Sequence, residues 1–122
     1  MKNSPTDVTA GDIHPELLRF LRETITTFAR WDLVRFFHDN PHATEIAENI
    51  AKVIVRPTDE VERELNALVA AGVLTSSMAG DVQVYRLGDD AATLRKVHAF
   101  VTACDDREFR MRAIREVIDQ MP

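Results

Sequence analysis

Hydrophobic residues recur at intervals of three and four along most of the chain from residue 14 onward, which is the spacing of amphipathic helices. The segment PELLRFLRETI begins with Pro15, a residue well suited to the first position of a helix. The next segment, FARWDLVRFFHDNP, is apolar on so many sides that we expect a helix buried on several of them, either in the core or against another subunit. It must stop before Pro41, because the residue preceding a proline avoids the helical region.

Two further helices are predicted in the middle of the chain. ATEIAENIAKVI, residues 43–54, indicates a short amphipathic helix, and residues 58–71 indicate a longer one with Thr58 as its N-cap. Gly72 follows at the position where a left-handed residue ends many helices. The apolar stripe expected to face the core on the longer helix consists of Val61, Leu65, Leu68 and Val69.

A β-hairpin is predicted after this helix. Residues 73–77 and 82–87 favour strands, and they flank a turn at Gly80. Alternation in the second strand places Tyr85 and Leu87 on one face. Residues 90–120 are helical again, as one helix or as two with a kink at residues 104–106.

Composition indicates one domain, because 122 residues is an ordinary domain length and 45% of them are hydrophobic. We expect a flexible tail over residues 1–13 and a single domain over residues 14–122. The N-terminal residues lack the apolar core of a signal peptide, and no apolar run approaches the ~20 residues of a membrane span. The single cysteine excludes an internal disulfide, so a cytoplasmic location is expected.

The order of three helices and a hairpin resembles a winged helix-turn-helix. TEIAENI is similar to the second helix of that fold, VERELNALVAAGVL to the third helix and its exit, and GDVQVYRL to the return strand of the wing. The match covers residues 28–87 and resembles bacterial transcriptional regulators of the MarR and ArsR type. The resemblance implies a mainly α fold with a small β-wing, an extra helix before the motif, and extra C-terminal helices over residues 90–120. It also implies binding to double-stranded DNA as a homodimer formed through the terminal helices. One departure is the connection AKVIVRPT, which is longer than the usual turn and lacks glycine.

A DNA contact would use the third helix. Its outer face carries Arg63 and Asn66, which can make bidentate contacts to guanine and adenine. The phosphate contacts would come from Thr44, Lys52, Arg56 and Arg86.

The charge of the motif is unfavourable for DNA. Residues 44–87 hold seven acids and four bases, which gives −3, and the wing tip SSMAGD has no cation. Asp59 and Arg63 are also spaced to pair with each other. The alternative function is therefore a protein-protein interaction module that docks its acidic third helix on a basic partner. Arginines cluster elsewhere, either as a solvated face paired with acids or, in a dimer, as a surface that faces phosphates or an acidic partner: Arg19, Arg22, Arg30, Arg35, Arg107, Arg110, Arg112 and Arg115.

Other candidate chemistry is sparse. His38 and His42 have a metal-ligand spacing, but Pro41 breaks the helix between them and we expect a helix end and loop. Cys104 is expected to be a small buried residue. The chain has no phosphate loop, nucleophile elbow or carboxylate cluster, so we expect no enzyme, no cofactor and no metal. The aromatic residues Trp31, Phe36 and Phe37 indicate either plain core or a ligand pocket beside the terminal helices.

Overall fold

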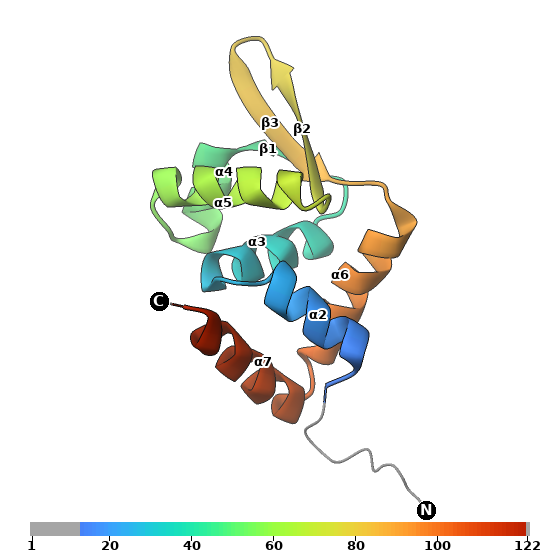
Figure 1. Ribbon diagram of the computed structural model, residues 1–122. Coiled ribbons are helices and arrows are strands. Elements are labelled where there is room, and N and C mark those ends of the chain that lie inside the picture. The colour runs from blue at the N-terminus through green and yellow to red at the C-terminus, as the bar shows by residue number, and fades with distance from the viewer. Residues whose placement is uncertain (1–12, 122) are drawn as a thin grey trace, which may run out of the picture.

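Residues 13–121 are described by the structure, a computed structural model (Figure 1). The tail expected over residues 1–13 therefore lies, except for its last residue, outside the described part. Within that part the chain forms six helices and a three-stranded antiparallel sheet. The mainly helical class predicted from the sequence, with a small β-wing, is confirmed.

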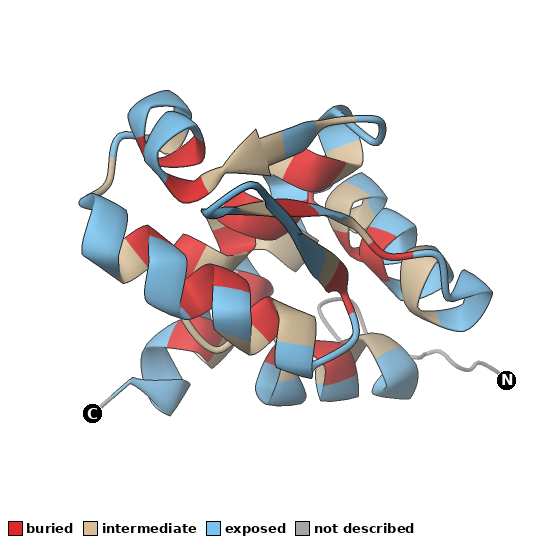
Figure 2. Cartoon of the chain, turned by 90° about the horizontal axis from the view of Figure 1, so that it is seen from above, coloured by how far each residue is buried: buried red, intermediate tan, exposed pale blue. Residues whose placement is uncertain are grey.

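Helix α3, Phe28–Asp39, is the central element of the core. It follows α2, Pro15–Glu23, and begins after Thr27, whose side chain accepts a hydrogen bond from the backbone N–H of Arg30 at 3.1 Å. Leu33, Val34 and Phe37 are fully buried in the subunit, and Figure 2 shows the buried segments gathered inside the molecule. The sequence left open whether this apolar helix belongs to the core or to a subunit contact. Within the subunit it belongs to the core.

The C-terminal segment forms two helices, α6, Ala91–Ala103, and α7, Arg107–Gln120. The carboxylates of Asp90 and Asp106 cap them, accepting from the N–H groups of Thr93 at 2.9 Å and Phe109 at 2.8 Å. Phe100 of α6 packs edge-on against Trp31 with ring centroids 5.1 Å apart. Phe100 therefore fills the space beside Trp31; Trp31 and Phe37 are core residues, whereas Phe36 is half-buried.

The prediction of a helix from residue 43 is wrong at its start. Residues Thr44–Ile46 form strand β1, and the helix α4 covers only Ala47–Ile54. Strand β1 pairs with β3, Val82–Leu87, with Thr44 opposite Arg86, so the sheet order is β1-β3-β2. Residues 44–46 form a strand because they hydrogen-bond to β3, which lies far away in the sequence, and local periodicity does not reveal such a partner.

Helix α5, Thr58–Ala70, begins one residue earlier than predicted. Pro57 is its N-cap and no side chain caps it, so the assignment of Thr58 as the N-cap is wrong: the N–H of Val61 already bonds to the carbonyl of Pro57 at 3.0 Å. The other end is as predicted. Gly72 has φ +82°, and the N–H of Val73 donates to the carbonyl of Leu68 at 3.0 Å, which is a Schellman ending.

The wing consists of β2, Leu74–Ala79, and β3, which project from the helices (Figure 1). Gly80 turns the chain with φ +69°, which glycine adopts without steric cost. Tyr85 points into the core and is buried, whereas Arg86 is exposed. The predicted alternation of the return strand is confirmed, and β2 runs two residues beyond its expected end.

Candidate nucleic-acid interface

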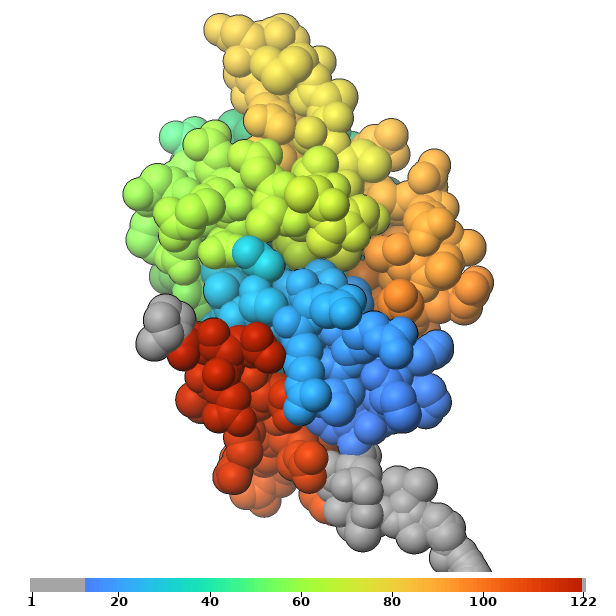
Figure 3. Space-filling view, in the orientation of Figure 1, coloured from blue at the N-terminus to red at the C-terminus, as the bar shows by residue number. Residues whose placement is uncertain are grey.

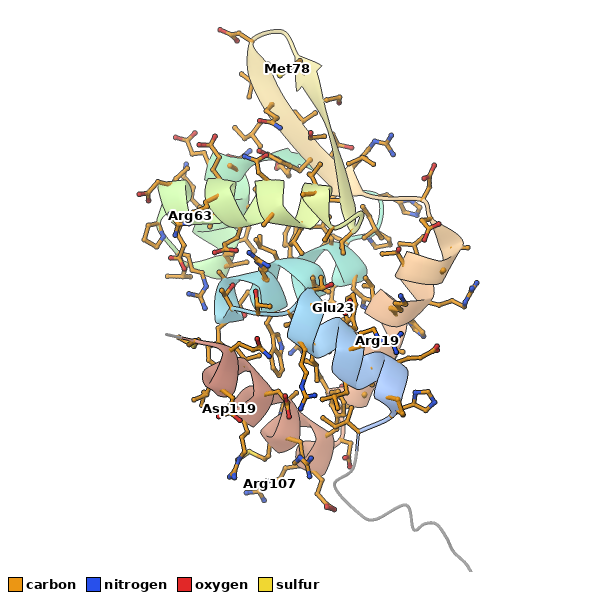
Figure 4. The ribbon with its side chains drawn as sticks, in the orientation of Figure 1. Arg19, Glu23, Arg63, Met78, Arg107 and Asp119 are labelled. Carbon is orange, nitrogen blue, oxygen red and sulfur yellow. The ribbon has the colours of Figure 1, made fainter. Side chains whose placement is uncertain are left out.

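The outer face of α5 is open to solvent. Val61, Leu65 and Leu68 are fully buried, so they hold the helix on α3 and α4 as the sequence indicates. The side chain of Arg63 lies on the opposite face with 67% of its surface exposed (Figure 4). The buried stripe therefore leaves one side of α5 available to another macromolecule.

Scaffold arginines neutralise part of the acidic surplus of α5. The carboxylate of Glu64 is turned inward and nearly buried, and it accepts a hydrogen bond from Nε of Arg30 on α3 at 2.6 Å. Glu60 lies 3.5 Å from the guanidinium of Arg56. Only Asp59 and Glu62, among the four acids of α5, form no ion pair with the residues that the structure describes. The exposed face is thus less acidic than the sequence count suggests.

Asn66 is connected to the wing, a contact that the sequence did not predict. Its Oδ1 accepts hydrogen bonds from the hydroxyl of Tyr85 at 2.9 Å and from Nε2 of Gln83 at 3.4 Å. In this arrangement Asn66 offers a base only its Nδ2 donor, because the oxygen needed for the expected bidentate contact to adenine is engaged. Burial raises the pKa of Tyr85, and the charge of Glu62 raises it further.

Arg56 is a structural residue in this conformation. Its Nε bonds to Asp32 of α3 at 2.9 Å, in addition to its contact with Glu60. Lys52 lies beside it on α4, is exposed, and lines with Arg56 a hollow of about 450 Å³ at the connection between α4 and α5. Of these two predicted phosphate contacts, Lys52 is the one without an ion-pair partner among the described residues.

Thr44 and Arg86 are brought together by the sheet. They are opposite each other on β1 and β3, and both are exposed. The structure therefore groups the six predicted residues into three places: Thr44 with Arg86 on the sheet, Lys52 with Arg56 at the α4–α5 connection, and Arg63 with Asn66 on α5.

Of the remaining arginines, Arg30 lies against α5 through its bond to Glu64, and others lie elsewhere. Arg19 and Arg107 lie at the end of the molecule away from the wing and from Arg63 (Figure 4). Several of the others pair within the subunit, as Arg22 does with Glu116 at 2.9 Å and Arg35 with Asp39 at 3.8 Å. For these the interpretation as a paired, solvated face holds. The proposed pairing of Asp59 with Arg63 is wrong, since Arg63 instead lies 4.0 Å from Glu64.

His38 lies at the end of α3 and His42 in the loop that follows, as the sequence predicts. Nε2 of His38 lies 3.0 Å from Nδ1 of His98 on α6, so its partner is this residue rather than His42. No group of three potential ligands in the described residues is arranged to hold a metal. Cys104 is buried as expected, and burial raises its pKa to about 11. It is therefore a protonated thiol at neutral pH and a poor ligand.

Three structural features define the fold class: an exposed helix α5 packed on α4, a two-stranded wing, and flanking helices. This is the winged helix-turn-helix fold.

A comparison with solved structures gives the same class, since one match is described as the crystal structure of the AntR antimony-specific transcriptional repressor. The two structures align with a TM-score of 0.62 at 14% sequence identity, over 88% of this chain and 98% of the other. No family model and no curated protein matches the sequence. Within the described residues no helix is both long and apolar enough to cross a membrane.

Proposed function

We propose that this protein is a DNA-binding transcriptional regulator and not an enzyme. The observation that carries the proposal is the α5 surface, where the acids nearest the scaffold are neutralised by Arg30 and Arg56 while Arg63 stays exposed. The likeness to a transcriptional repressor over nearly the whole of both chains supports the same role. The resemblance of residues 28–87 to MarR and ArsR regulators is consistent with it, as is a cytoplasmic location.

The proposed contacts divide by role. Arg63 reads a base in the major groove, with Asn66 beside it contributing a single donor through Nδ2. Thr44, Lys52 and Arg86 contact phosphates, and Arg56 joins them only if it leaves Asp32. Two exposed cations per subunit that contact phosphates, Lys52 and Arg86, give a salt dependence with a slope of about −2 per subunit in log K against log[salt], at ~0.9 per phosphate.

The antimony specificity in the name of the structural neighbour is not part of this proposal. The chain contains one cysteine, and soft metal ions are held by thiolate ligands. Because Cys104 is buried with a raised pKa, we propose no thiolate-bound effector for this protein.

The experiment is selection of duplexes from a random library at low salt, followed by binding titrations with the selected sequence. Arg63→Ala should relax the preference at one base pair, at a cost of about 1–3 kcal/mol there. Arg107→Ala is the matched control, because this arginine is exposed but lies at the far end of the molecule. If no duplex is enriched at low salt, the protein is not a DNA-binding regulator and the protein-interaction alternative takes its place.

We further propose that the protein is a homodimer formed through its terminal helices. Helix α7 presents Met111 and Ile118, which are each 55% exposed, and Met121 follows directly after its end with 48% exposed. Met111, half-buried Ile114 and Ile118 are spaced three and four residues apart, the pattern of a helix that packs against another helix. Helix α7 lies at the opposite end of the molecule from the wing, so a second copy bound there leaves α5 free (Figure 1).

A further inference from the structure

A hollow of about 380 Å³ lies between the beginning of α2 and the first turns of α6. The surfaces of these two helices meet along one side of the molecule (Figure 3). On α6 the lining residues are Ala92, Arg95, Lys96 and Ala99, which are the successive positions of one helical face. His14, Glu16 and Leu17 line it from the start of α2.

The walls of this hollow combine apolar surface with two adjacent cations. Leu17, Ala92 and Ala99 supply apolar groups, and Arg95 and Lys96 supply the cations. Glu16 also lines the hollow, and Asp90 at the start of α6 lies near enough to interact with both cations. Arg95 and Lys96 form no ion pair with any residue that the structure describes. Seven other cations of the described residues also lack one, but Arg95 and Lys96 are adjacent and both line this hollow.

We propose that this hollow binds a small organic acid, with its carboxylate on Arg95 and Lys96 and its apolar body against Leu17 and Ala99. A guanidinium matches a carboxylate with two parallel hydrogen bonds, and the neighbouring ammonium adds a point charge. The volume is near the lower end of the ~300–1,000 Å³ typical of small-molecule sites, so the ligand is compact, with a single ring or a short chain. The site does not depend on the proposed DNA-binding function, because it lies on α2 and α6.

The test is a titration of the ¹⁵N-labelled full chain with phenylacetate, followed by NMR. The amide signals of Leu17, Ala92, Arg95 and Ala99 should shift together and saturate. Phenylacetamide, which lacks the charge, and acetate, which lacks the ring, should each bind at least tenfold more weakly. Signals that do not move up to 10 mM phenylacetate (about the weakest binding of interest), or shifts centred elsewhere, would overturn the proposal.

Three variants make the result specific. Arg95→Gln should weaken phenylacetate binding about tenfold, since it removes the charge-assisted pair of hydrogen bonds. Ala99→Phe fills the hollow from an exposed helix position and should abolish binding while the spectrum stays that of a folded protein. Lys52→Gln removes a cation outside the hollow and should leave the affinity unchanged. Equal affinity in the wild type, Arg95→Gln and Ala99→Phe would show that the ligand binds somewhere else.

Discussion

The ion pair between Arg30 and Glu64 connects the acidic helix to the core. Glu64 is only 8% exposed, so its charge depends on the guanidinium 2.6 Å away. Arg30→Ala should reduce the free energy of unfolding by about 2–4 kcal/mol, somewhat less than breaking a fully buried pair, because the Arg30 side chain keeps some exposure. Chemical denaturation measures the loss.

Arg35→Ala provides the control for this prediction. Arg35 and Asp39 are 3.8 Å apart, and both side chains are more than half exposed. Removing such a pair should change the unfolding free energy by at most about 0.5 kcal/mol. Equal losses in the two variants would mean that the Arg30 contact contributes no more than a surface pair.

The hydroxyl of Tyr85 positions Asn66, which follows from their 2.9 Å hydrogen bond. Tyr85→Phe keeps the buried ring and should cost about 1 kcal/mol of stability through the lost bond. If Asn66 contacts a base, the freed side chain should also change the sequence preference at that base pair and not at the one read by Arg63. Binding to duplexes with single base-pair changes measures this. An unchanged profile at every position would remove Asn66 from the interface.

The connection between α4 and α5 is the most unusual element of the motif. Val55 ends α4 with φ 59° and ψ 58°, a left-handed conformation that a β-branched residue rarely adopts, and it is 84% exposed. Because a valine and not a glycine occupies this left-handed position, the backbone of the connection is strained. Val55→Gly should stabilise the protein by about 0.5–1 kcal/mol, since relief of ~1–2 kcal/mol of strain exceeds the added entropy of the unfolded chain.

A change of the opposite sign in stability is expected two residues earlier. Val53 is also an exposed valine but lies inside α4, so Val53→Gly should destabilise by about 0.5 kcal/mol through helix propensity. Thermal and denaturant unfolding of both variants compare the two positions directly. Destabilisation by Val55→Gly would show that the left-handed conformation carries no appreciable strain.

Elements formed by local signals could be predicted from the sequence, and contacts between distant residues could not. The stripe of Val61, Leu65 and Leu68 and the Gly72 ending are written in a few neighbouring positions, so α5 was predicted nearly to the residue. Strand β1 was missed because three residues carry almost no periodicity and their pairing partner is β3. The same reason applies to the site: the exposure of Arg63 follows from the helical wheel, whereas the bonds of Asn66 to Tyr85 and of Arg56 to Asp32 require the folded chain.

At the scale of the whole molecule, the charge distribution means that the proposed DNA binding requires more than one subunit. The two exposed cations proposed to contact phosphates in each subunit, Lys52 and Arg86, provide little non-specific attraction, and a second copy doubles that number. Helix α2 is attached to α7 by the bond from Arg22 to Glu116, so the two terminal helices form one layer at the end opposite the wing. A dimer through this layer would hold two α5 helices in a fixed geometry, which predicts a two-fold symmetric DNA site.

The dimer is tested by Ile118→Asp, which places a charge in the middle of the exposed stripe of α7. The wild type should have the mass of two chains in sedimentation equilibrium at micromolar concentration, and the variant the mass of one, with a retained helical spectrum. Val53→Asp is the matched control, because it charges an exposed valine on α4 and should remain dimeric. DNA affinity should fall in Ile118→Asp as dimerisation is lost, since each subunit then binds its half-site alone. A monomeric wild type would exclude the dimer, and a dimeric Ile118→Asp would show that subunits meet elsewhere.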